Sequence, residues 1–486
     1  MSLPVIAQNG VPQNGIANDT VHFNIEEFLA TEQSKDLLRL TTAGSVDDGK
    51  STLIGRMLHD ARGAYEDQLK SASRGGQIDF ALLTDGLRAE REQGITIDVA
   101  YRYFATPKRK FILADTPGHE QYTRNMATGA STAELAIILC DASRGLTTQS
   151  RRHAYIAALL GIPKFVIAVN KMDLVDYNQD VFNEICAEFA PFLQNASARD
   201  PYFLPLSALK GDNVVDRSSK MPWFTGPSLL EYLESVDTRT HSLEAPFRMA
   251  VQGVLRPDQT FRGYTGQIAS GVIRPGDEVL ALPSGRRTRV RRIVTFDGDL
   301  EVAFAPLSVT LALEDEIDIG RGDIIAAGEP PQSARTFDST MVWFDSKPLD
   351  TARHYLVKHA SHVVPAHVEA VRHRLNILSL DSEPAASLSM NEIGVVRIAT
   401  SRDLFIDRYA DNRLTGSFIL IDRETNATAA AGMILSRARN AAENAADRVA
   451  RLIRSFVPAG ALLNLPAEDS AAVEELRRRL QGVWDE

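Results

Sequence analysis

The stretch GSVDDGKS, residues 44–51, constrains the fold of this chain more than any other. Gly44, four further residues and then Gly49, Lys50 and Ser51 form a loop whose successive backbone N–H groups can face one point, which suits a polyphosphate. The apolar run LLRLTTA precedes the loop and a helix-like stretch follows it, so the loop is predicted to join a strand to a helix. In that setting Lys50 is predicted to neutralise the β- and γ-phosphates, and the Ser51 hydroxyl to bind Mg²⁺.

The size and composition of the chain limit what else it can be. At 486 residues it exceeds the usual size of a single core, so several domains are expected. With 44% hydrophobic and 24% charged residues it has a globular composition, and its apolar runs are too short to span a membrane. The start MSLPVIAQNG lacks the features of a signal peptide, so we expect a cytoplasmic protein. A formal net charge of -10 argues against a nonspecific nucleic-acid coat, and no nucleic-acid partner is expected.

The hydrophobic pattern divides the chain into successive segments. Residues 1–36 begin with many Asn, Gln and Gly and are expected to be disordered or weakly ordered. Over 37–240, strand-length apolar runs alternate with helix-length stretches, which predicts an α/β P-loop domain with a parallel-type sheet and flanking helices. Period-two alternation within 244–335 and 338–434 predicts two small antiparallel β-barrels. Residues 435–486 carry the apolar spacing of amphipathic helices and are predicted to form a helical tail.

The hexapeptide DTPGHE, residues 115–120, directly follows the predicted strand KFILA. Asp115 should therefore emerge at the carboxyl end of the sheet beside the phosphate-binding loop of residues 44–51, here called the cradle. At that position a carboxylate can hold Mg²⁺ through water. Gly118 lets a backbone N–H approach the γ-phosphate without a side chain in the way. His119 is the candidate catalytic residue, predicted to orient the attacking water. The alternative for His119 is an exposed loop histidine without chemistry.

The identity of the base is predicted from NKMD, residues 170–173. The Asp173 carboxylate can accept two hydrogen bonds from the N1–H and exocyclic amine of guanine, whereas adenine presents an acceptor at N1. Leaving such groups unpaired costs about 1–3 kcal/mol each, so GTP is favoured over ATP. Asn170 is expected to tie this loop to the cradle, and the stem of Lys171 to cover the base. Alone the tetrapeptide is a common surface turn, and its order after the cradle and DTPG favours guanine.

Two further stretches complete the predicted site. Thr96, in REQGITIDVAYRYF, is predicted to bring its hydroxyl to Mg²⁺ with triphosphate bound and to withdraw it after hydrolysis; the alternative is a strand threonine. The predicted Mg²⁺ ligands are thus Ser51, Thr96 and Asp115. The predicted GTP contacts are Gly44, Ser45, Val46, Asp47, Asp48, Gly49, Lys50, Ser51, Thr52, Asp115, Thr116, Pro117, Gly118, His119, Asn170, Lys171, Met172, Asp173 and, as donors to the guanine carbonyl, Ser207, Ala208 and Leu209.

Over about residues 37–434 the chain resembles translational-type GTPases such as elongation factor Tu. The resemblance rests on five motifs in a fixed order, followed by two β-rich blocks: GSVDDGKS, QGITI, DTPGHE, NKMD and SAL. Within that group, LLTDGLRAEREQGITIDVAYRYF, MPWFTGPSLLEYLE, FRGYTGQIASG and RIVTFDGD resemble the large, GTPase subunits of bacterial sulfate adenylyltransferases. Within these motifs, the chain differs from the tRNA-carrying factor at two positions. Asp48 stands where that factor has histidine, and Gln93 stands where it has arginine.

The resemblance implies a heterodimer in which a smaller subunit binds ATP and sulfate and makes adenosine 5'-phosphosulfate and pyrophosphate. This chain would couple GTP hydrolysis to that uphill reaction, which requires its GTP and GDP forms to bind different states of the partner. The sequence contains no second phosphate cradle, so adenylyl transfer is expected on the partner and any adenylylsulfate kinase on a separate protein. The alternatives are an elongation-factor-like carrier of aminoacyl-tRNA and a GTP-dependent scaffold without coupling.

Overall fold

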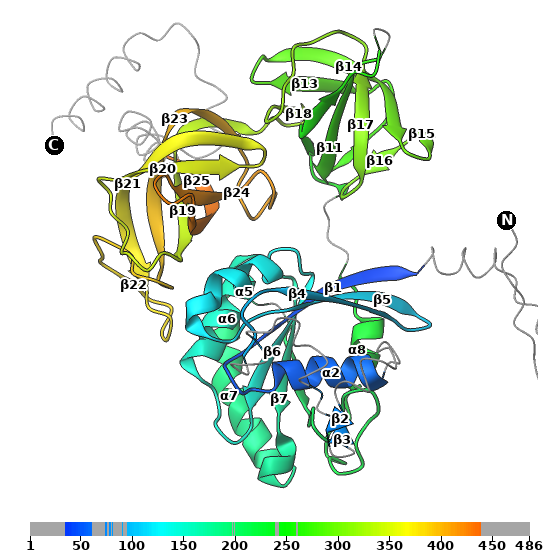
Figure 1. The fold of residues 1–486 in the computed structure, drawn as a ribbon, viewed down its shortest axis with the longest axis vertical. Coiled ribbons are helices and arrows are strands. Elements are labelled where there is room, and N and C mark those ends of the chain that lie inside the picture. Colours follow the sequence, from blue (N-terminus) through cyan, green and yellow to red (C-terminus); the bar gives the residue numbers. More distant parts are fainter. Residues whose placement is uncertain are drawn as a thin grey trace, which may run out of the picture.

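The computed structural model describes residues 35–60, 73–74, 77–78, 80, 90, 95–196, 198, 200–238, 243–258 and 261–438. Most of the predicted amino-terminal segment and helical tail lie outside these residues, as does Gln93. Figure 1 shows the described part as three units, an α/β unit followed by two β-barrels, which confirms the predicted fold class. None of the helices among these residues is long and apolar enough to cross a membrane.

The α/β unit is built on a six-stranded sheet with the order β4-β5-β1-β6-β7-β8. Its strands pair in parallel except for the edge strand β4, which runs antiparallel to β5. Every position of the central strand β6 is buried, as expected for a parallel strand covered on both faces. The strands are β1 (Asp36–Ala43), β4 (Ala100–Ala105), β5 (Arg109–Asp115), β6 (Leu135–Asp141), β7 (Lys164–Asn170) and β8 (Tyr202–Pro205), with a separate hairpin of β2 (Ser73–Arg74) and β3 (Gln77–Ile78).

Helices cover both faces of this sheet. Ile137 of β6 belongs to the apolar cluster under α2 and α8, whereas its neighbour Ile138 belongs to the cluster under α5, α6 and α7. Successive strand residues therefore serve opposite layers, which is why the strand sequences are apolar without alternation. The helices are α2 (Lys50–Asp60), α5 (Thr123–Ala130), α6 (Thr148–Leu159), α7 (Gln179–Asn195) and α8 (Leu229–Ser235), with short 3₁₀ turns η2 (Glu120–Tyr122) and η3 (Met172–Val175).

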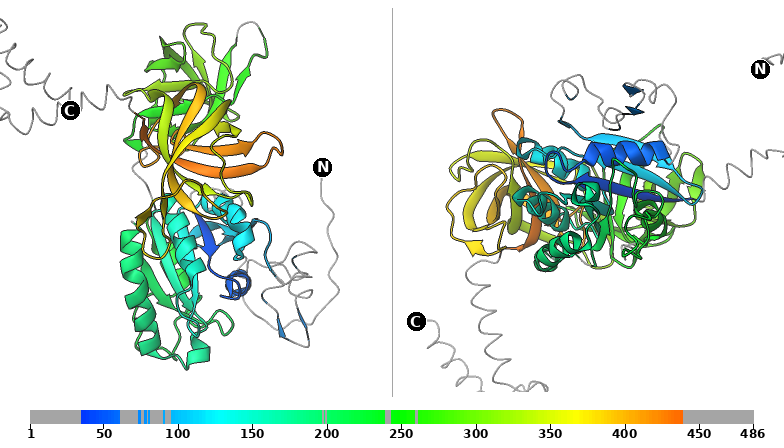
Figure 2. Two further views of the ribbon diagram at one scale, coloured as in Figure 1. Left: turned by 90° about the vertical axis from the view of Figure 1, so that its left-hand side faces the viewer. Right: turned by 90° about the horizontal axis from the view of Figure 1, so that it is seen from below.

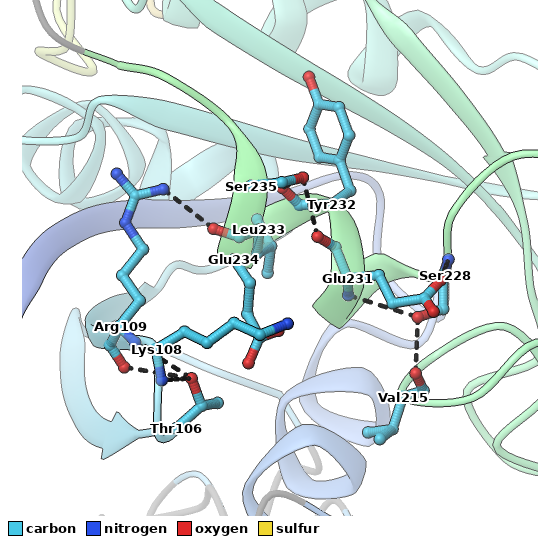
Figure 3. Close-up of polar contacts among 10 residues, drawn as sticks. All are labelled: Thr106, Lys108, Arg109, Val215, Ser228, Glu231, Tyr232, Leu233, Glu234 and Ser235. Carbon is cyan, nitrogen blue, oxygen red and sulfur yellow. Dashed lines mark hydrogen bonds and ion pairs between the residues drawn. The ribbon is translucent and has the colours of Figure 1, made fainter.

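Side-chain hydrogen bonds cap both ends of the short helix α8 (Figure 3). Ser228 Oγ accepts a hydrogen bond from the Glu231 backbone N at 3.4 Å, and the Glu231 carboxylate accepts one from the Ser228 backbone N at 2.8 Å, which forms a capping box. At the other end the buried Arg109 guanidinium donates to the Leu233 carbonyl oxygen at 3.0 Å, a group the helix itself leaves unpaired. The same guanidinium donates to Asp36 Oδ2 at 2.6 Å, so α8 is tied to the first residue of β1.

Both β-rich blocks close into antiparallel barrels, as predicted, and each barrel is a ring of six strands. The first barrel follows the ring β9-β11-β17-β14-β13-β18 and the second follows β19-β23-β21-β20-β24-β25. Closure pairs the ring strands along both edges, and a separate apolar cluster fills each interior. The first barrel comprises β9 (Phe247–Ala250), β10 (Gly253–Leu255), β11 (Gly263–Ser270), β12 (Val272–Ile273), β13 (Glu278–Leu282), β14 (Arg286–Thr295), β15 (Gly298–Leu300), β16 (Ala303–Phe304), β17 (Ser308–Leu313) and β18 (Ile324–Ala327). The second comprises β19 (Gln332–Trp343), β20 (His354–His359), β21 (His362–Leu375), β22 (Ser382–Glu383), β23 (Ile393–Ile406), β24 (Ser417–Asp422) and β25 (Thr428–Arg437).

The second barrel packs directly on the α/β unit (Figures 1 and 2). Val342, Ile393 and Met433 of the barrel belong to the same apolar cluster as residues of α5, α6 and α7. The Tyr409 hydroxyl donates to the Leu160 carbonyl oxygen, just after α6, at 2.8 Å. The apolar core beneath these helices therefore continues into the barrel, which makes this contact part of the fold.

A partly buried ion pair joins the two barrels to each other. The Arg248 side chain of the first barrel donates to both carboxylate oxygens of Asp407 at 3.0 and 3.2 Å. Beside it, Asn412 Nδ2 donates to Ser270 Oγ at 2.9 Å. Because Asp407 and Asn412 flank Tyr409, the same loop of the second barrel contacts the first barrel and the α/β unit.

Candidate nucleotide-binding site

The predicted cradle is the loop that joins β1 to α2. Its backbone is left-handed at Asp47, with φ of 67°, and at Gly49, with φ of 89°. A Cβ atom at Gly49 would lie 2.4 Å from Asn170 Nδ2, so only glycine fits where that side chain crosses the loop. The loop is therefore shaped by the backbone preferences of its own residues and by one side chain from the end of β7.

Lys50 begins α2 and its ammonium group is held by the loop. Nζ donates to the carbonyl oxygens of Gly44 at 3.2 Å and Ser45 at 2.7 Å. A Cβ atom at Gly118 would lie 2.3 Å from Nζ, so the glycine of DTPGHE lets the second loop approach this lysine. Burial lowers the pKa of Lys50, and the negative charge of Asp48 is the foremost opposing influence. The positive charge thus lies at the junction of two loops, where a γ-phosphate would be expected.

The three predicted Mg²⁺ ligands come from helix α2, from strand β5 and from the loop that precedes β4. Ser51 Oγ in the first turn of α2 lies 3.5 Å from Thr96 Oγ1, so the structure brings these two hydroxyls together. Asp115 ends β5, is only 1% exposed and stands opposite Thr42 of β1 in the strand register. Its charge acts on Lys50, which places it within electrostatic reach of the cradle. An oxygen-only donor set of this kind fits Mg²⁺.

A cavity of about 350 Å³ lies over the cradle. His119 is half-buried at its wall, and its Nδ1 accepts a hydrogen bond from the Gln121 backbone N at 3.3 Å, which caps η2. The His119 ring also lies 6.0 Å from the ring of Tyr122. The predicted catalytic residue therefore faces the same space as the cradle. The lining residues are Val46, Asp47, Gly49, Lys50, Ser51, Thr52, Ile95, Thr96, Gly118, His119 and Lys171.

At the predicted base end, side chains link three loops. Asn170 Nδ2 donates to the Asp48 carbonyl oxygen at 2.7 Å, while Asn170 Oδ1 accepts from the Ala208 backbone N at 2.9 Å. Asp173 Oδ1 accepts a hydrogen bond from Ser207 Oγ at 2.6 Å. NKMD, the cradle and the SAL segment are therefore connected through buried or half-buried polar contacts, and Asp173 is oriented by one of them.

Lys171 lies between the two ends, and its partner was not predicted from the sequence. Its backbone is left-handed, with φ of 62°, and its Nζ lies 2.7 Å from Asp141 Oδ2. Burial would raise the pKa of Asp141, but hydrogen bonds from Lys171 and Ser143 outweigh it and hold that pKa below the usual range. A sequence signal existed, because Asp141 ends the apolar strand β6 just as Asp115 ends β5.

His153 is a second unpredicted residue at the cradle. Its side chain is fully buried in α6, and Nδ1 accepts a hydrogen bond from the Gly44 backbone N at 3.1 Å. Burial lowers the pKa of His153 to about 3, so the ring is neutral at pH 7 and Nδ1 is available as an acceptor. The sequence offered no signal, because one histidine in the helix-like stretch SRRHAYIAALLG resembles an ordinary core residue.

The remaining predicted residues divide between the site and the surroundings. Met172 is fully buried in an apolar cluster with Val169 and Phe182, so its side chain serves the core. The side chain of Leu209, the last residue of the SAL segment, is 59% exposed on the surface. Thr116 Oγ1 donates to the Thr42 carbonyl oxygen at 2.5 Å and thereby anchors the DTPGHE loop to β1. Pro117, like Thr116, is buried in that loop.

Known families match two parts of the chain. The family described as Elongation factor Tu GTP binding domain matches residues 35–242, and the family described as GTP-eEF1A C-terminal domain-like matches residues 336–435. The first match covers the whole cradle, the DTPGHE loop, NKMD and the SAL segment. The second covers nearly all of the second barrel.

Curated relatives are similar over most of the chain. Sulfate adenylyltransferase subunit 1 of Bacteroides fragilis (strain YCH46) is 52% identical over 433 residues, which cover 87% of this chain and 91% of the relative. The protein of the same name from Laribacter hongkongensis (strain HLHK9) is 53% identical, covering 90% of this chain and 93% of the relative. The bifunctional enzyme CysN/CysC of Rhodopirellula baltica (strain DSM 10527 / NCIMB 13988 / SH1) is 52% identical, covering 86% of this chain and 67% of the relative. With the elongation factor Tu type of nucleotide domain already established, these identities show that the chain belongs to the sulfate adenylyltransferase subunit 1 family of GTPases.

Proposed function

We propose that this chain is the GTP-hydrolysing subunit of a sulfate adenylyltransferase and couples GTP hydrolysis to the formation of adenosine 5'-phosphosulfate and pyrophosphate from ATP and sulfate. The observation that carries this proposal is the 52% identity over 433 residues with a relative of that name. The assembled nucleotide site supports it independently, because coupling requires a chain that can bind and hydrolyse GTP itself.

Recognition of guanine is assigned to the loops at the ends of β7 and β8. Asp173 would accept the N1–H and exocyclic amine of guanine, and the Ser207 hydroxyl that donates to it at 2.6 Å would hold the carboxylate in place. The stem of Lys171 would cover the base while its ammonium group is anchored on Asp141 at 2.7 Å. A carboxylate held by a neighbouring hydroxyl group is pre-organised, so less side-chain entropy is lost when guanine binds.

Phosphate binding and hydrolysis are assigned to the other end of the site. Ser51, Thr96 and Asp115 would hold Mg²⁺, which supplies charge neutralisation of the phosphates when bound. The Lys50 ammonium group would contact the β- and γ-phosphates, and backbone N–H groups of the cradle would surround them. His119 would orient the attacking water, since it faces the cavity and directly follows Gly118.

Transmission of the nucleotide state is assigned to the segment that follows His119. Asn391 of the second barrel is buried, and its Nδ2 donates to the Glu120 carbonyl oxygen at 2.7 Å. A shift of the DTPGHE loop on loss of the γ-phosphate would therefore break or move a contact with the barrel. Such a difference between GTP and GDP forms is what coupling to a partner requires.

The partner is proposed to be a smaller subunit that binds ATP and sulfate, with this chain and that subunit forming a heterodimer in the cytoplasm. Adenylylsulfate kinase activity, where present, is assigned to a separate protein. We propose residues 37–240 as the GTP-binding domain, with 244–335 and 338–434 as the two barrel domains.

The proposal is tested by measuring GTP hydrolysis by the purified chain, with Mg²⁺, in the presence and absence of the candidate small subunit, ATP and sulfate. We expect hydrolysis to rise only when all three are added, and adenosine 5'-phosphosulfate to accumulate only while GTP is consumed. Stimulation by ribosomes with aminoacyl-tRNA would instead indicate an elongation-factor-like carrier. A rate that responds to neither would indicate a scaffold and would contradict coupling.

A further inference from the structure

Asp48 is a carboxylate buried within the phosphate cradle itself. Its side chain is 0% exposed, and Oδ2 accepts a hydrogen bond from the Ser45 backbone N at 2.6 Å. Among the described residues, no group donates a hydrogen bond to the other oxygen, Oδ1. A buried carboxylate oxygen without a donor destabilises the folded chain, so its presence at a ligand site calls for a functional explanation.

The charges around Asp48 belong to the nucleotide site. Burial raises the pKa of Asp48, and the positive charge of Lys50 is the foremost influence that opposes the rise. Asp141 and Lys171 also act on this carboxyl group. Conversely, Asp48 is the carboxylate with the largest effect on the pKa of Lys50, which it raises. The lysine that is assigned to the phosphates is therefore already partly neutralised by a residue of its own loop.

Two consequences for a bound polyphosphate follow. The Ser45 N–H is bonded to Asp48 and is not available to a phosphate oxygen, which removes one donor from the cradle. A negative charge beneath the loop also repels the phosphates, and its effect is strong because burial reduces screening by water and salt. Asp47, next in the chain, offers a contrast, because its side chain is 67% exposed and lies 3.9 Å from Arg144.

We propose that Asp48 sets the rate of GDP release, by weakening the hold of the cradle on the phosphates so that the nucleotide leaves quickly after hydrolysis. This inference rests on the proposed function, because it takes the ligand of the cradle to be GTP before hydrolysis and GDP after it. It also gives a physical role to a residue that distinguishes this cradle from that of the tRNA-carrying factor.

The test compares Asp48→Asn with Asp297→Asn, an exposed aspartate in the turn between β14 and β15, by the dissociation of fluorescent N-methylanthraniloyl-GDP from the full chain. Asparagine keeps the size of Asp48 and an oxygen that can accept the Ser45 N–H, so only the charge is removed. We expect GDP to leave about tenfold more slowly from Asp48→Asn, at low and at high salt, as one poorly screened charge requires. Asp297→Asn should leave the rate unchanged at both salt concentrations, because Asp297 lies outside the nucleotide site and water and salt screen its exposed charge.

Each result separates this inference from the proposed function. GDP release that is unchanged or faster in Asp48→Asn, in a variant with the wild-type melting temperature, overturns the role of Asp48. An effect of Asp48→Asn that disappears at high salt overturns it as well, because the charge would then be exposed. Should Asp48→Asn fail to fold, Asp48→Ser removes the same charge and is judged by the same rates. A wild-type chain that binds no guanine nucleotide contradicts the proposed function, whatever the variants do.

Discussion

The two ends of the proposed nucleotide site are built by different means. At the phosphate end the backbone forms the site, through left-handed residues such as Gly49 and through loops that meet around Lys50. At the base end side chains form it, because Asn170 and Asp173 are each held by hydrogen bonds from the SAL segment. Every nucleoside triphosphate has the same phosphates, whereas only side-chain chemistry distinguishes the bases. Substitutions at the base end should therefore change which nucleotide binds, and those at the phosphate end should change how fast it is bound, cleaved or released.

The largest effect is expected at the base end, for Asp173→Asn. Loss of two hydrogen bonds at about 2 kcal/mol each should weaken GTP binding about 1,000-fold, while an amide donor facing the xanthine carbonyl should improve XTP binding. A nucleotide competition assay measures both changes. Asp176→Asn is a matched control, since Asp176 is exposed on the same loop and should leave the preference for GTP intact. Unchanged GTP preference in Asp173→Asn would contradict the assignment of base recognition to Asp173.

At the phosphate end, His119→Ala should slow chemistry without changing binding. We expect single-turnover GTP hydrolysis to fall about 100-fold, the lower end of what a positioned proton-transfer or water-orienting group contributes, with GTP affinity within about twofold of the wild type. His354→Ala, an exposed histidine on β20, serves as the control. A full-rate His119→Ala enzyme would return His119 to the status of a loop histidine, and a large loss of GTP affinity would assign it to binding.

The sequence predicted the residues that sit at the ends of strands. Asp115 and Asn170 could be found because apolar parallel strands end at one edge of the sheet, and Asp141 satisfies the same rule although it was not singled out. His153 could not be found, because its role depends on which turn of α6 faces Gly44, and helix packing decides that. The antiparallel pairing of β4 was also not predicted, since AYRYFA alternates in burial like any edge strand and alternation does not specify direction.

The fold was predictable as a class, and its contacts between units were not. Alternation of apolar residues predicts strands that line a barrel, but the closing pair β19 and β25 joins residues about 90 positions apart. Similarly, Tyr409 shows no pattern that would indicate a hydrogen bond to Leu160 of another unit. Such contacts depend on how whole units meet, so they follow from three-dimensional packing and leave little trace in local periodicity.

Asp141→Asn tests the link between the two ends and is expected to have a moderate effect. Because the Asp141 pKa is held below its ordinary value of 3.8, the charged form stabilises the folded state at higher pH, and this contribution is lost as the pH falls through the folded-state pKa. The variant should lose about 2 kcal/mol of unfolding free energy at pH 7, typical of a hydrogen bond to a charged group. Urea unfolding followed across pH should show the difference between variant and wild type shrinking only below 3.8. A difference that is constant over the whole range would mean that Lys171 and Asp141 act through packing alone.

The smallest effect is expected outside the site, for Tyr409→Phe. Removing the hydroxyl deletes one hydrogen bond between the second barrel and the α/β unit, which should cost about 1 kcal/mol of stability measured by urea unfolding. The substitution should leave the preference for guanine unchanged, because the base end shares no contact with Tyr409. GDP release is the more informative measurement, since α6 carries His153 on the cradle and ends beside the Leu160 carbonyl that Tyr409 contacts. If GDP release stays within about twofold of the wild type, contacts of α6 with the second barrel do not affect the phosphate end. The barrel and the phosphate end would then be linked only through the DTPGHE loop. A larger change would mean that α6 also couples the second barrel to the cradle. The phosphate end would then respond to the position of the barrel, whereas the base end would not.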